Sequence, residues 1–378
     1  MAKLVAIFAD GLGYHYTQNK SVEALFQRIF EVTVPLRSNL GFSIGLLPSI
    51  WTSCYPRKHG YWAEFFIKKP YEPKAINLRR LQWYLTTLAL YGIKRIQILF
   101  SKESSLYPSI PGSIANHFCR ADIKLSEPFK SSSVPSIFSV LDNNEVTYEY
   151  LFRDRIRDAD IQLINKSDVV TFHLGEIDKY GHAYGPDSDL LIKKILTFLK
   201  MVNKIAEKTP VFLFSDHGMF PIVATWDLLH LLSKLNCRLG KDYLVFLDAT
   251  MARFWFFTHR AEEEITRSLS TLSAGHFLSK DEIIINGMDF PHNAYGDKIF
   301  LLNPGIEIYP NFFHPFYKNL FRGMHGYTPL AQNSFALFAS TFGKKRSTME
   351  STILDTSPTI LKFLGISPPE EWKGSAIV

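Results

Sequence analysis

Asp178-Lys179-Tyr180-Gly181-His182 is the stretch of sequence that decides the fold prediction, together with Asp216-His217-Gly218-Met219 further along the chain. Each of these Asp/His clusters follows a short run of apolar and β-branched residues, and Asp10 follows a third such run. The runs are typical of buried parallel strands and lie at residues 4–8, Val169–Leu174 and Val211–Phe214. Ligands of open α/β sheets bind beyond the carboxyl ends of the strands, so three carboxylates in equivalent places predict a functional site there.

The order of the elements predicts an α/β fold with a doubly wound, mostly parallel central sheet and helices on both faces. Residues 187–208 carry apolar side chains at the spacing of one helix face, and residues 355–364 are a second predicted helix. We expect a single catalytic domain over residues 1–378. Two segments, 62–128 and 220–320, have the character of insertions, and we predict that both form caps on the loop side of the site.

The composition limits the class of protein. The 378 residues are 46% hydrophobic, which is enough for a substantial core, and they carry a formal net charge of +6. That mild excess of positive charge favours a small anionic substrate or surface, and we expect no nucleic-acid polymer as a partner. Three widely spaced Cys residues make neither a disulfide framework nor a Cys-based zinc site. Since no signal peptide or transmembrane segment is visible in the sequence, we expect a cytoplasmic protein.

Carboxylate and imidazole groups at these spacings are the ligands that divalent metal ions bind in proteins. Asp178 and His182 lie four residues apart around a glycine, and we expect a loop or first helical turn to direct both towards one ion. Asp216 and His217 are adjacent, and a tight turn at Gly218 would let both point the same way. The alternative for any one of these residues is a helix cap or a satisfied polar group.

Two further candidates, Asp10 and His325, lie near the two ends of the chain. If all six side chains converge, they form a two-metal hydrolytic centre. Four such residues in two motifs make the structural alternative less favourable than it is for any single residue.

Several motifs occur in a fixed order along nearly the whole chain. They are Phe8-Ala9-Asp10-Gly11, residues 176–186, Ser215-Asp216-His217-Gly218-Met219, Gly323-Met324-His325-Gly326-Tyr327 and residues 355–366. Through these motifs the chain resembles the alkaline phosphatase superfamily, and specifically its nucleotide pyrophosphatase/phosphodiesterase branch.

The resemblance implies a ligand set for each of two divalent metal ions. One ion would be held by Asp178, His182 and His325, and the other by Asp10, Asp216 and His217. Zinc is the expected metal, with manganese or iron as alternatives. A nucleophilic Ser or Thr would contact both ions.

In the family, the nucleophile precedes a stretch that is represented here by residues 52–60. The family's spacing places the nucleophile at Ser43, which we also expect as a metal ligand. Coordination to a dication would activate its hydroxyl, which is a poor nucleophile by itself. Ser49, Thr52 and Ser53 are rivals, but they fall at positions that correspond to scaffold residues in the family.

The chain departs from the family at Leu46. The branch usually has an Asn at this place, whose amide donates a hydrogen bond to a phosphoryl oxygen, and Leu cannot donate one. A missing donor of this kind can lower a rate by about a hundredfold or more. Another donor is therefore expected: the backbone N–H of Ile44, the Asn39 side chain, or a Lys or Arg of the first insertion.

The activity implied by the resemblance is that of a phosphoric ester hydrolase. It would cleave a phosphodiester or related phosphoryl bond through a covalent phosphoryl-serine intermediate. The alternatives are a phosphotransferase or phosphomonoesterase of the same superfamily in a biosynthetic pathway, and a non-catalytic metal-binding relative.

The first insertion, residues 62–128, interleaves basic and aromatic side chains. It has three interpretations: a solvated helical face, a cap that recognises a phosphate ester with an aromatic or lipid-like group, or a helix that contacts a membrane surface around residues 79–95. In the second insertion, Tyr243–Leu247 has the pattern of a strand.

Overall fold

The computed structural model describes residues 2–67, 110–314, 320–344 and 350–378. The basic and aromatic residues between Lys68 and Lys102, and the membrane-surface helix predicted around residues 79–95, lie outside the described residues. The two ends of the first insertion are described, and they pair with each other: β3 (Phe65–Ile67) runs antiparallel to β4 (Phe118–Arg120).

The central sheet has seven strands in the order β17-β2-β16-β7-β1-β6-β5. Four neighbouring strands, β7, β1, β6 and β5, are parallel, and β16 is antiparallel to both of its neighbours. The strands are β1 (Leu4–Ala9), β2 (Val32–Arg37), β5 (Tyr148–Arg153), β6 (Val169–Leu174), β7 (Val211–Phe214), β16 (Ala336–Ser340) and β17 (Ser351–Thr352). The predicted mostly parallel α/β sheet and its three apolar strands are confirmed.

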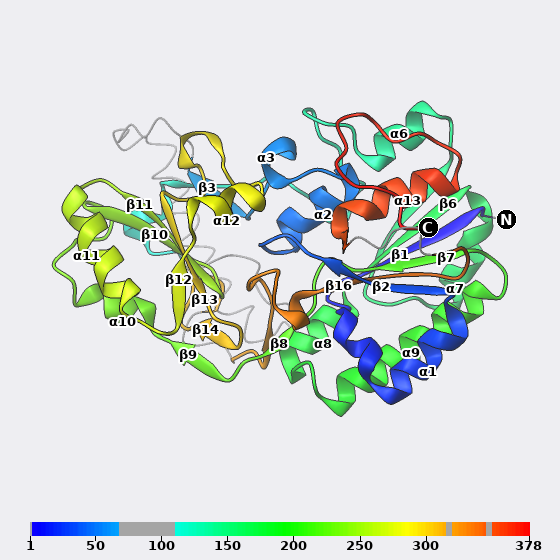
Figure 1. Ribbon diagram of the computed structural model, residues 1–378, viewed down its shortest axis with the longest axis horizontal. Coiled ribbons are helices and arrows are strands. Elements are labelled where there is room, and N and C mark those ends of the chain that lie inside the picture. The colour runs from blue at the N-terminus through cyan, green and yellow to red at the C-terminus, as the bar shows by residue number, and fades with distance from the viewer. Residues whose placement is uncertain (1, 68–109, 315–319, 345–349) are drawn as a thin grey trace, which may run out of the picture.

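Helices cover both faces of this sheet (Figure 1). Successive side chains of β1 point to opposite faces, and all of them are buried. Val5 and Ile7 belong to the core under α1 (Lys20–Ile29) and α9 (Asp189–Ala206). Ala6 and Phe8 belong to the core under α2 (Ser43–Thr52), α6 (Ile137–Asn143) and α13 (Thr356–Phe363). The helices predicted at 187–208 and 355–364 are therefore confirmed, each slightly shorter than expected.

Short helical turns connect the longer elements of the chain. They are η1 (Tyr14–Gln18), α3 (Pro56–His59), α5 (Gly112–Ala115), α7 (Asp158–Ile161), η2 (Gln162–Lys166), η4 (Gln332–Ser334) and η5 (Ile353–Asp355). α8 (Glu176–Tyr184) follows β6 and leads into α9.

A second, antiparallel sheet lies beside the central one, at the left of Figure 1. Its strand order is β10-β11-β13-β12. The strands are β10 (Tyr243–Leu247), β11 (Met251–Phe256), β12 (Gly275–Phe277) and β13 (Lys298–Leu302). The helical segments around them are α10 (Leu228–Ser233), α11 (His259–Ser270), α12 (Lys280–Ile285) and η3 (Pro291–Asn293). The predicted strand Tyr243–Leu247 is confirmed as β10.

A buried arginine, Arg253, joins the second sheet to the first insertion. Arg253 of β11 is fully buried, donates to Asp248 at 2.7 Å and donates to the carbonyl oxygen of Phe65 at 2.6 Å. The rings of Phe65 and Phe246 also stack, with their centroids 5.1 Å apart. The β3–β4 strand pair is therefore part of the same core as β10 and β11.

Two small strand pairs lead the chain from the second sheet back to the first. β9 (Ala224–Trp226) pairs with β14 (Ile306–Ile308), and β8 (Phe220–Pro221) pairs with β15 (Gly323–Met324). The β8–β15 pair places the residue after Met324 next to the end of β7.

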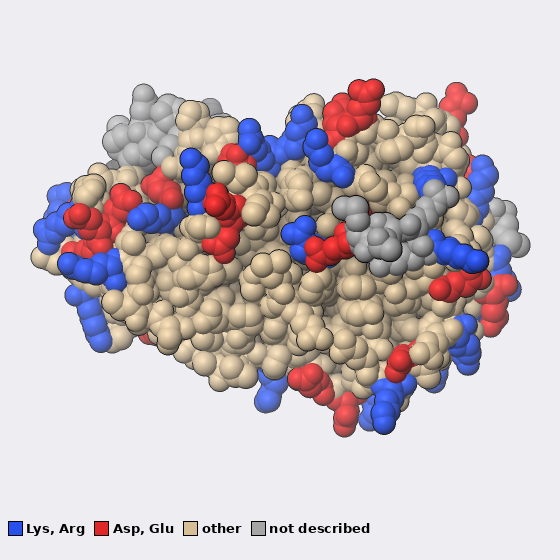
Figure 2. Space-filling view, viewed as in Figure 1, with Lys and Arg blue, Asp and Glu red and all other residues tan. Residues whose placement is uncertain are grey.

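Acidic and basic side chains are intermixed along the margin of the face shown in Figure 2, so the described residues of this face form no broad field of one sign. Among the described helices, none has the length and apolar character needed to cross a membrane.

Candidate metal centre

Asp10 and Asp178 are held side by side by main-chain hydrogen bonds at the carboxyl edge of the sheet. Asp10 follows β1 directly, and its N–H donates to the carbonyl oxygen of Leu174 at the end of β6 at 2.9 Å. The N–H of Asp178 in turn donates to the carbonyl oxygen of Asp10 at 3.1 Å. Because both carboxylates depend on parallel pairing of β1 with β6, the fold itself brings them together.

Asp178 and His182 lie on one face of α8, one helical turn apart. Their side chains meet, with 3.3 Å between His182 Nε2 and Asp178 Oδ1. His182 Nδ1 lies 2.8 Å from the carbonyl oxygen of Gly323, so that nitrogen carries the proton and Nε2 is left as a ligand atom.

Asp216 and His217 follow β7, and the turn at Gly218 directs both into the same space. A side chain at Gly218 would overlap the carbonyl oxygen of Asn333, so only glycine fits there. His217 Nε2 lies 3.3 Å from Asp10 Oδ1 and 3.5 Å from Asp216 Oδ2. Its Nδ1 is 2.8 Å from the carbonyl oxygen of Gly218, the same arrangement as in His182.

His325 reaches the cluster from the far end of the chain, just after β15. Its Nε2 lies 3.7 Å from Asp178 Oδ1. Its ring stacks on that of His217, with centroids 3.6 Å apart and planes at 8°. All six predicted ligand residues are therefore brought to one place.

Ser43 is the first residue of α2 and lies against this cluster. Its hydroxyl donates to Asp10 Oδ1 at 3.3 Å and lies 3.2 Å from His217 Nε2. The N-terminus of a helix favours an anion, because its first N–H groups and the positive end of its dipole point outward.

The rival hydroxyl groups are committed elsewhere. Thr52 donates to the carbonyl oxygen of Pro48, and Ser53 donates to that of Leu354. Ser49 donates within α2 and lies 2.9 Å from His59 Nε2, and all three rivals are fully buried. Only Ser43, of the four hydroxyls considered in the sequence, touches the Asp/His cluster.

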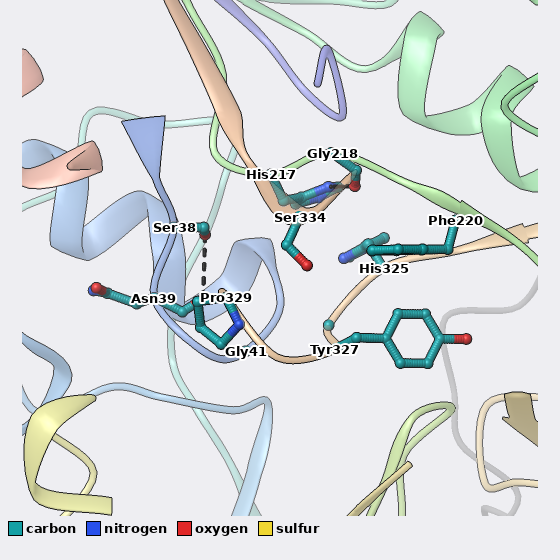
Figure 3. Close-up of a pocket in the computed structure, with 11 residues that line it drawn as sticks. Ser38, Asn39, Gly41, His217, Gly218, Phe220, His325, Tyr327, Pro329 and Ser334 are labelled. Atoms are coloured by element: carbon teal, nitrogen blue, oxygen red, sulfur yellow. Dashed lines mark hydrogen bonds between the residues drawn. The ribbon is translucent and has the colours of Figure 1, made fainter. Parts of the chain in front are cut away.

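The departure at Leu46 has a structural counterpart. Leu46 is 1% exposed and packs in the core beneath α2, so it does not face the cluster. The Asn39 side chain points away from His217 and His325 in Figure 3. Of the substitute donors considered, the N–H groups at the start of α2, which include that of Ile44, lie next to Ser43.

The charges in the cluster strongly perturb one another. Burial raises the pKa of Asp10 and of Asp216, because a carboxylate charge is costly away from water. Burial acts in the same direction on Asp178, but the charges of His182, His325 and His217 outweigh it and lower the pKa of that carboxyl. For His182 and His217, burial opposes protonation, yet neighbouring carboxylates raise the pKa of both rings.

The donor set fits divalent metal ions. Two groups have ligand atoms that all lie within 4.8 Å of one another: Asp178, His217 and His325, and Asp10, Asp216 and His217. Asp178 Oδ1 and Asp216 Oδ2 are buried and accept no hydrogen bond from the described residues. Oxygen and imidazole nitrogen ligands with buried, unpaired oxygens suit a borderline cation such as zinc.

His182 contacts Asp178 but is in neither compact group, whereas His217 is in both. The sequence did not predict that His217 would belong to both ligand groups or that its ring would stack on that of His325. Two serines that border the cluster, Ser38 and Ser334, were also missed, because a single hydroxyl in a loop gives no sequence signal.

Residues 4–328 match the model of the protein family described as type I phosphodiesterase / nucleotide pyrophosphatase. The chain belongs to this family. It is therefore a phosphoric ester hydrolase of a metal-dependent family, and the family implies nucleotide substrates. A comparison with curated protein sequences finds no match.

Solved structures of two mammalian family members share the fold. Murine ectonucleotide pyrophosphatase / phosphodiesterase 5 aligns over 99% of this chain and 97% of its own, with a TM-score of 0.66 and 15% identity. The human protein gives the same coverage, TM-score and identity. An inactive variant of the murine protein in complex with AMP aligns over 99% and 98% with 14% identity and a TM-score of 0.66. The predicted fold is confirmed by these likenesses.

Proposed function

We propose that this phosphodiesterase-family protein hydrolyses a nucleotide-like phosphodiester through two divalent metal ions and a covalent phosphoryl-serine intermediate at Ser43. The observation that carries the proposal is the position of the Ser43 hydroxyl, 3.3 Å from Asp10 Oδ1 and 3.2 Å from His217 Nε2. A hydroxyl at that place contacts the ligand groups directly, as a metal-activated nucleophile must.

The ligand sets follow the sequence prediction. Asp178, His182 and His325 would hold one ion, and Asp10, Asp216 and His217 the other. Ser43, expected from the sequence to contact both ions, lies against Asp10 and His217. Bound there, two cations would lower the pKa of the Ser43 hydroxyl and of a water, and offset the charge of the phosphoryl oxygens. Zinc is the proposed metal, with manganese and iron as alternatives.

The protein's own groups then position the reaction. Ser43 Oγ forms the bond to phosphorus as the bond to the leaving oxygen breaks, and the N–H groups at the start of α2 face the phosphoryl oxygens. A water next displaces Ser43 Oγ from phosphorus, which restores the serine and releases the phosphomonoester. Two in-line displacements predict net retention of configuration at phosphorus.

The substrate class rests on the family and on the relative that was solved with AMP. We further propose that residues 220–320 form a cap over the leaving-group side. The second sheet supports this, because the chain that leaves it passes through β14 and then β15 before it reaches His325.

Turnover of bis-p-nitrophenyl phosphate beside p-nitrophenyl phosphate tests the proposal, in chelator-treated protein before and after zinc is restored. We expect chelator-sensitive hydrolysis with a preference for the diester. Preference for the monoester would favour a phosphomonoesterase, and silence on both substrates by zinc-loaded protein would favour a transfer reaction; either result contradicts the proposal.

A further inference from the structure

His325 differs from the two other histidines of the centre in how its second ring nitrogen is held. His182 and His217 each direct Nδ1 at a backbone carbonyl oxygen, at 2.8 Å in both cases. His325 directs Nε2 towards Asp178, but its Nδ1 is buried and has no hydrogen-bond partner among the described residues. A histidine that binds a metal through Nε2 carries its proton on Nδ1, and leaving a buried donor unpaired is unfavourable.

A small pocket borders this ring. It is lined by both stacked histidines, His217 and His325, and by Ser334 of η4, and it has room for about one water molecule. In Figure 3 the Ser334 hydroxyl points towards the His325 ring. Among the described contacts no direct hydrogen bond joins the two side chains, so a link between them requires a water in the pocket.

The Ser334 hydroxyl can act only as an acceptor here. Its single proton is committed to the carbonyl oxygen of Thr328 at 2.7 Å, and the residue is 8% exposed. Its remaining lone pairs are free to accept from a water. The chain of donors and acceptors then runs in one direction, from His325 Nδ1–H through a water to Ser334 Oγ and on to Thr328.

We propose that the pocket is a binding site for one structural water and that Ser334, through this water, fixes the tautomer and orientation of His325. Ser334 is thus a positioning residue for one metal site. The inference rests on the proposed role of His325 as a metal ligand. Outer partners of this kind typically change metal affinity by about 10–100-fold when they are removed.

Zinc affinity of Ser334→Ala, measured by competition with a chelating dye, tests the inference. We expect one of the two zinc ions to bind about 10–100-fold more weakly, and the other to bind as in the wild type. Ser357→Ala is the matched control, because Ser357 is also a buried serine whose hydroxyl donates to a carbonyl oxygen, that of Ile50 at 2.6 Å. It should leave both zinc affinities unchanged, and urea unfolding of the zinc-free proteins should show comparable stability for the two variants.

A crystal structure of the zinc-loaded wild type is the second measurement. It should show a water within hydrogen-bond distance of both His325 Nδ1 and Ser334 Oγ. Wild-type zinc affinity in Ser334→Ala, or a different partner on His325 Nδ1, would overturn this inference alone. A wild-type protein that binds no zinc would instead contradict the proposed function.

Discussion

Gly181→Ala is a small change that should disturb the metal centre without touching a ligand. Gly181 lies in α8 between Asp178 and His182 and is buried. A Cβ added there would overlap Met219 Sδ and lie 2.8 Å from its Cε. Met219 is fully buried, and Gly323 also lies close to it, since a Cβ at Gly323 would lie 2.8 Å from the same sulfur.

The magnitude follows from this crowding. Because ordinary contact begins near 3.4 Å, Met219 Sδ must move by at least about 1 Å and its Cε by about 0.6 Å, or α8 must shift by about 1 Å. Overpacking of a core costs about 1–3 kcal/mol, and replacing Gly by Ala in a helix returns about 1 kcal/mol. We expect a stability loss of about 0–2 kcal/mol, and a fall in turnover of up to about a hundredfold as the ligands of α8 move relative to His217.

Urea unfolding, zinc titration and diester turnover measure these effects. Gly175→Ala is the control, because a Cβ at Gly175, the N-cap of the same helix, meets no atom within 4 Å. If Gly181→Ala weakens zinc binding as expected, the double variant Gly181→Ala/Met219→Ala should recover part of the zinc affinity, since it removes the side chain that the new Cβ overlaps. The reasoning is refuted if Gly181→Ala binds zinc and turns over as the wild type does, or if the double variant shows no recovery.

Three further predictions concern the nucleophile Ser43, the buried histidine His59 and the buried ion pair of Arg253 with Asp248. Ser43→Ala should keep its zinc and fold while losing turnover by about a thousandfold or more, and near-normal turnover would exclude Ser43 as the nucleophile. Burial lowers the pKa of His59 to about 3 from its ordinary value of 6.5, so the stability that its neutral ring contributes is complete above pH 6.5 and is lost as the pH falls towards 3. Between pH 7 and pH 5, protonation of His59 should lower the free energy of unfolding of the zinc-free protein by about 2 kcal/mol, as measured by urea unfolding. The His59→Gln variant should lack this part of the decline. An equal decline in the variant would contradict the assignment. Arg253→Met leaves Asp248 buried without its partner and should lower the free energy of unfolding by about 3–5 kcal/mol. Adding Asp248→Asn should restore part of that stability. An equal loss of stability in the single and double variants would argue against the ion pair.

The strands that carry the centre could be predicted because their signal is local. β1, β6 and β7 are continuous apolar runs, each with an Asp at or soon after its end, and a parallel sheet places such ends together. α9 was found within two residues at each end, since its apolar stripe is regular and Ser188 caps it.

The parts that could not be predicted depend on contacts between distant residues. In the second sheet, β13 lies between β11 and β12, although it follows both in the sequence. Only tertiary packing decides this order. The position of His325 beside the other ligand candidates depends on pairing between β8 and β15, which are about a hundred residues apart in the sequence. The family's spacing favoured Ser43 over Ser49 in the sequence, but which hydroxyl contacts the cluster could be stated only once the partners of each were known.

The central claim is that six side chains hold two metal ions around Ser43, and anomalous diffraction from crystals of the zinc-loaded protein tests it most directly. The account predicts two zinc peaks: one contacted by Asp178, His182 and His325, and one contacted by Asp10, Asp216 and His217, with Ser43 Oγ adjacent to the second. A single peak, or zinc bound away from these residues in protein that still hydrolyses diesters, would contradict it.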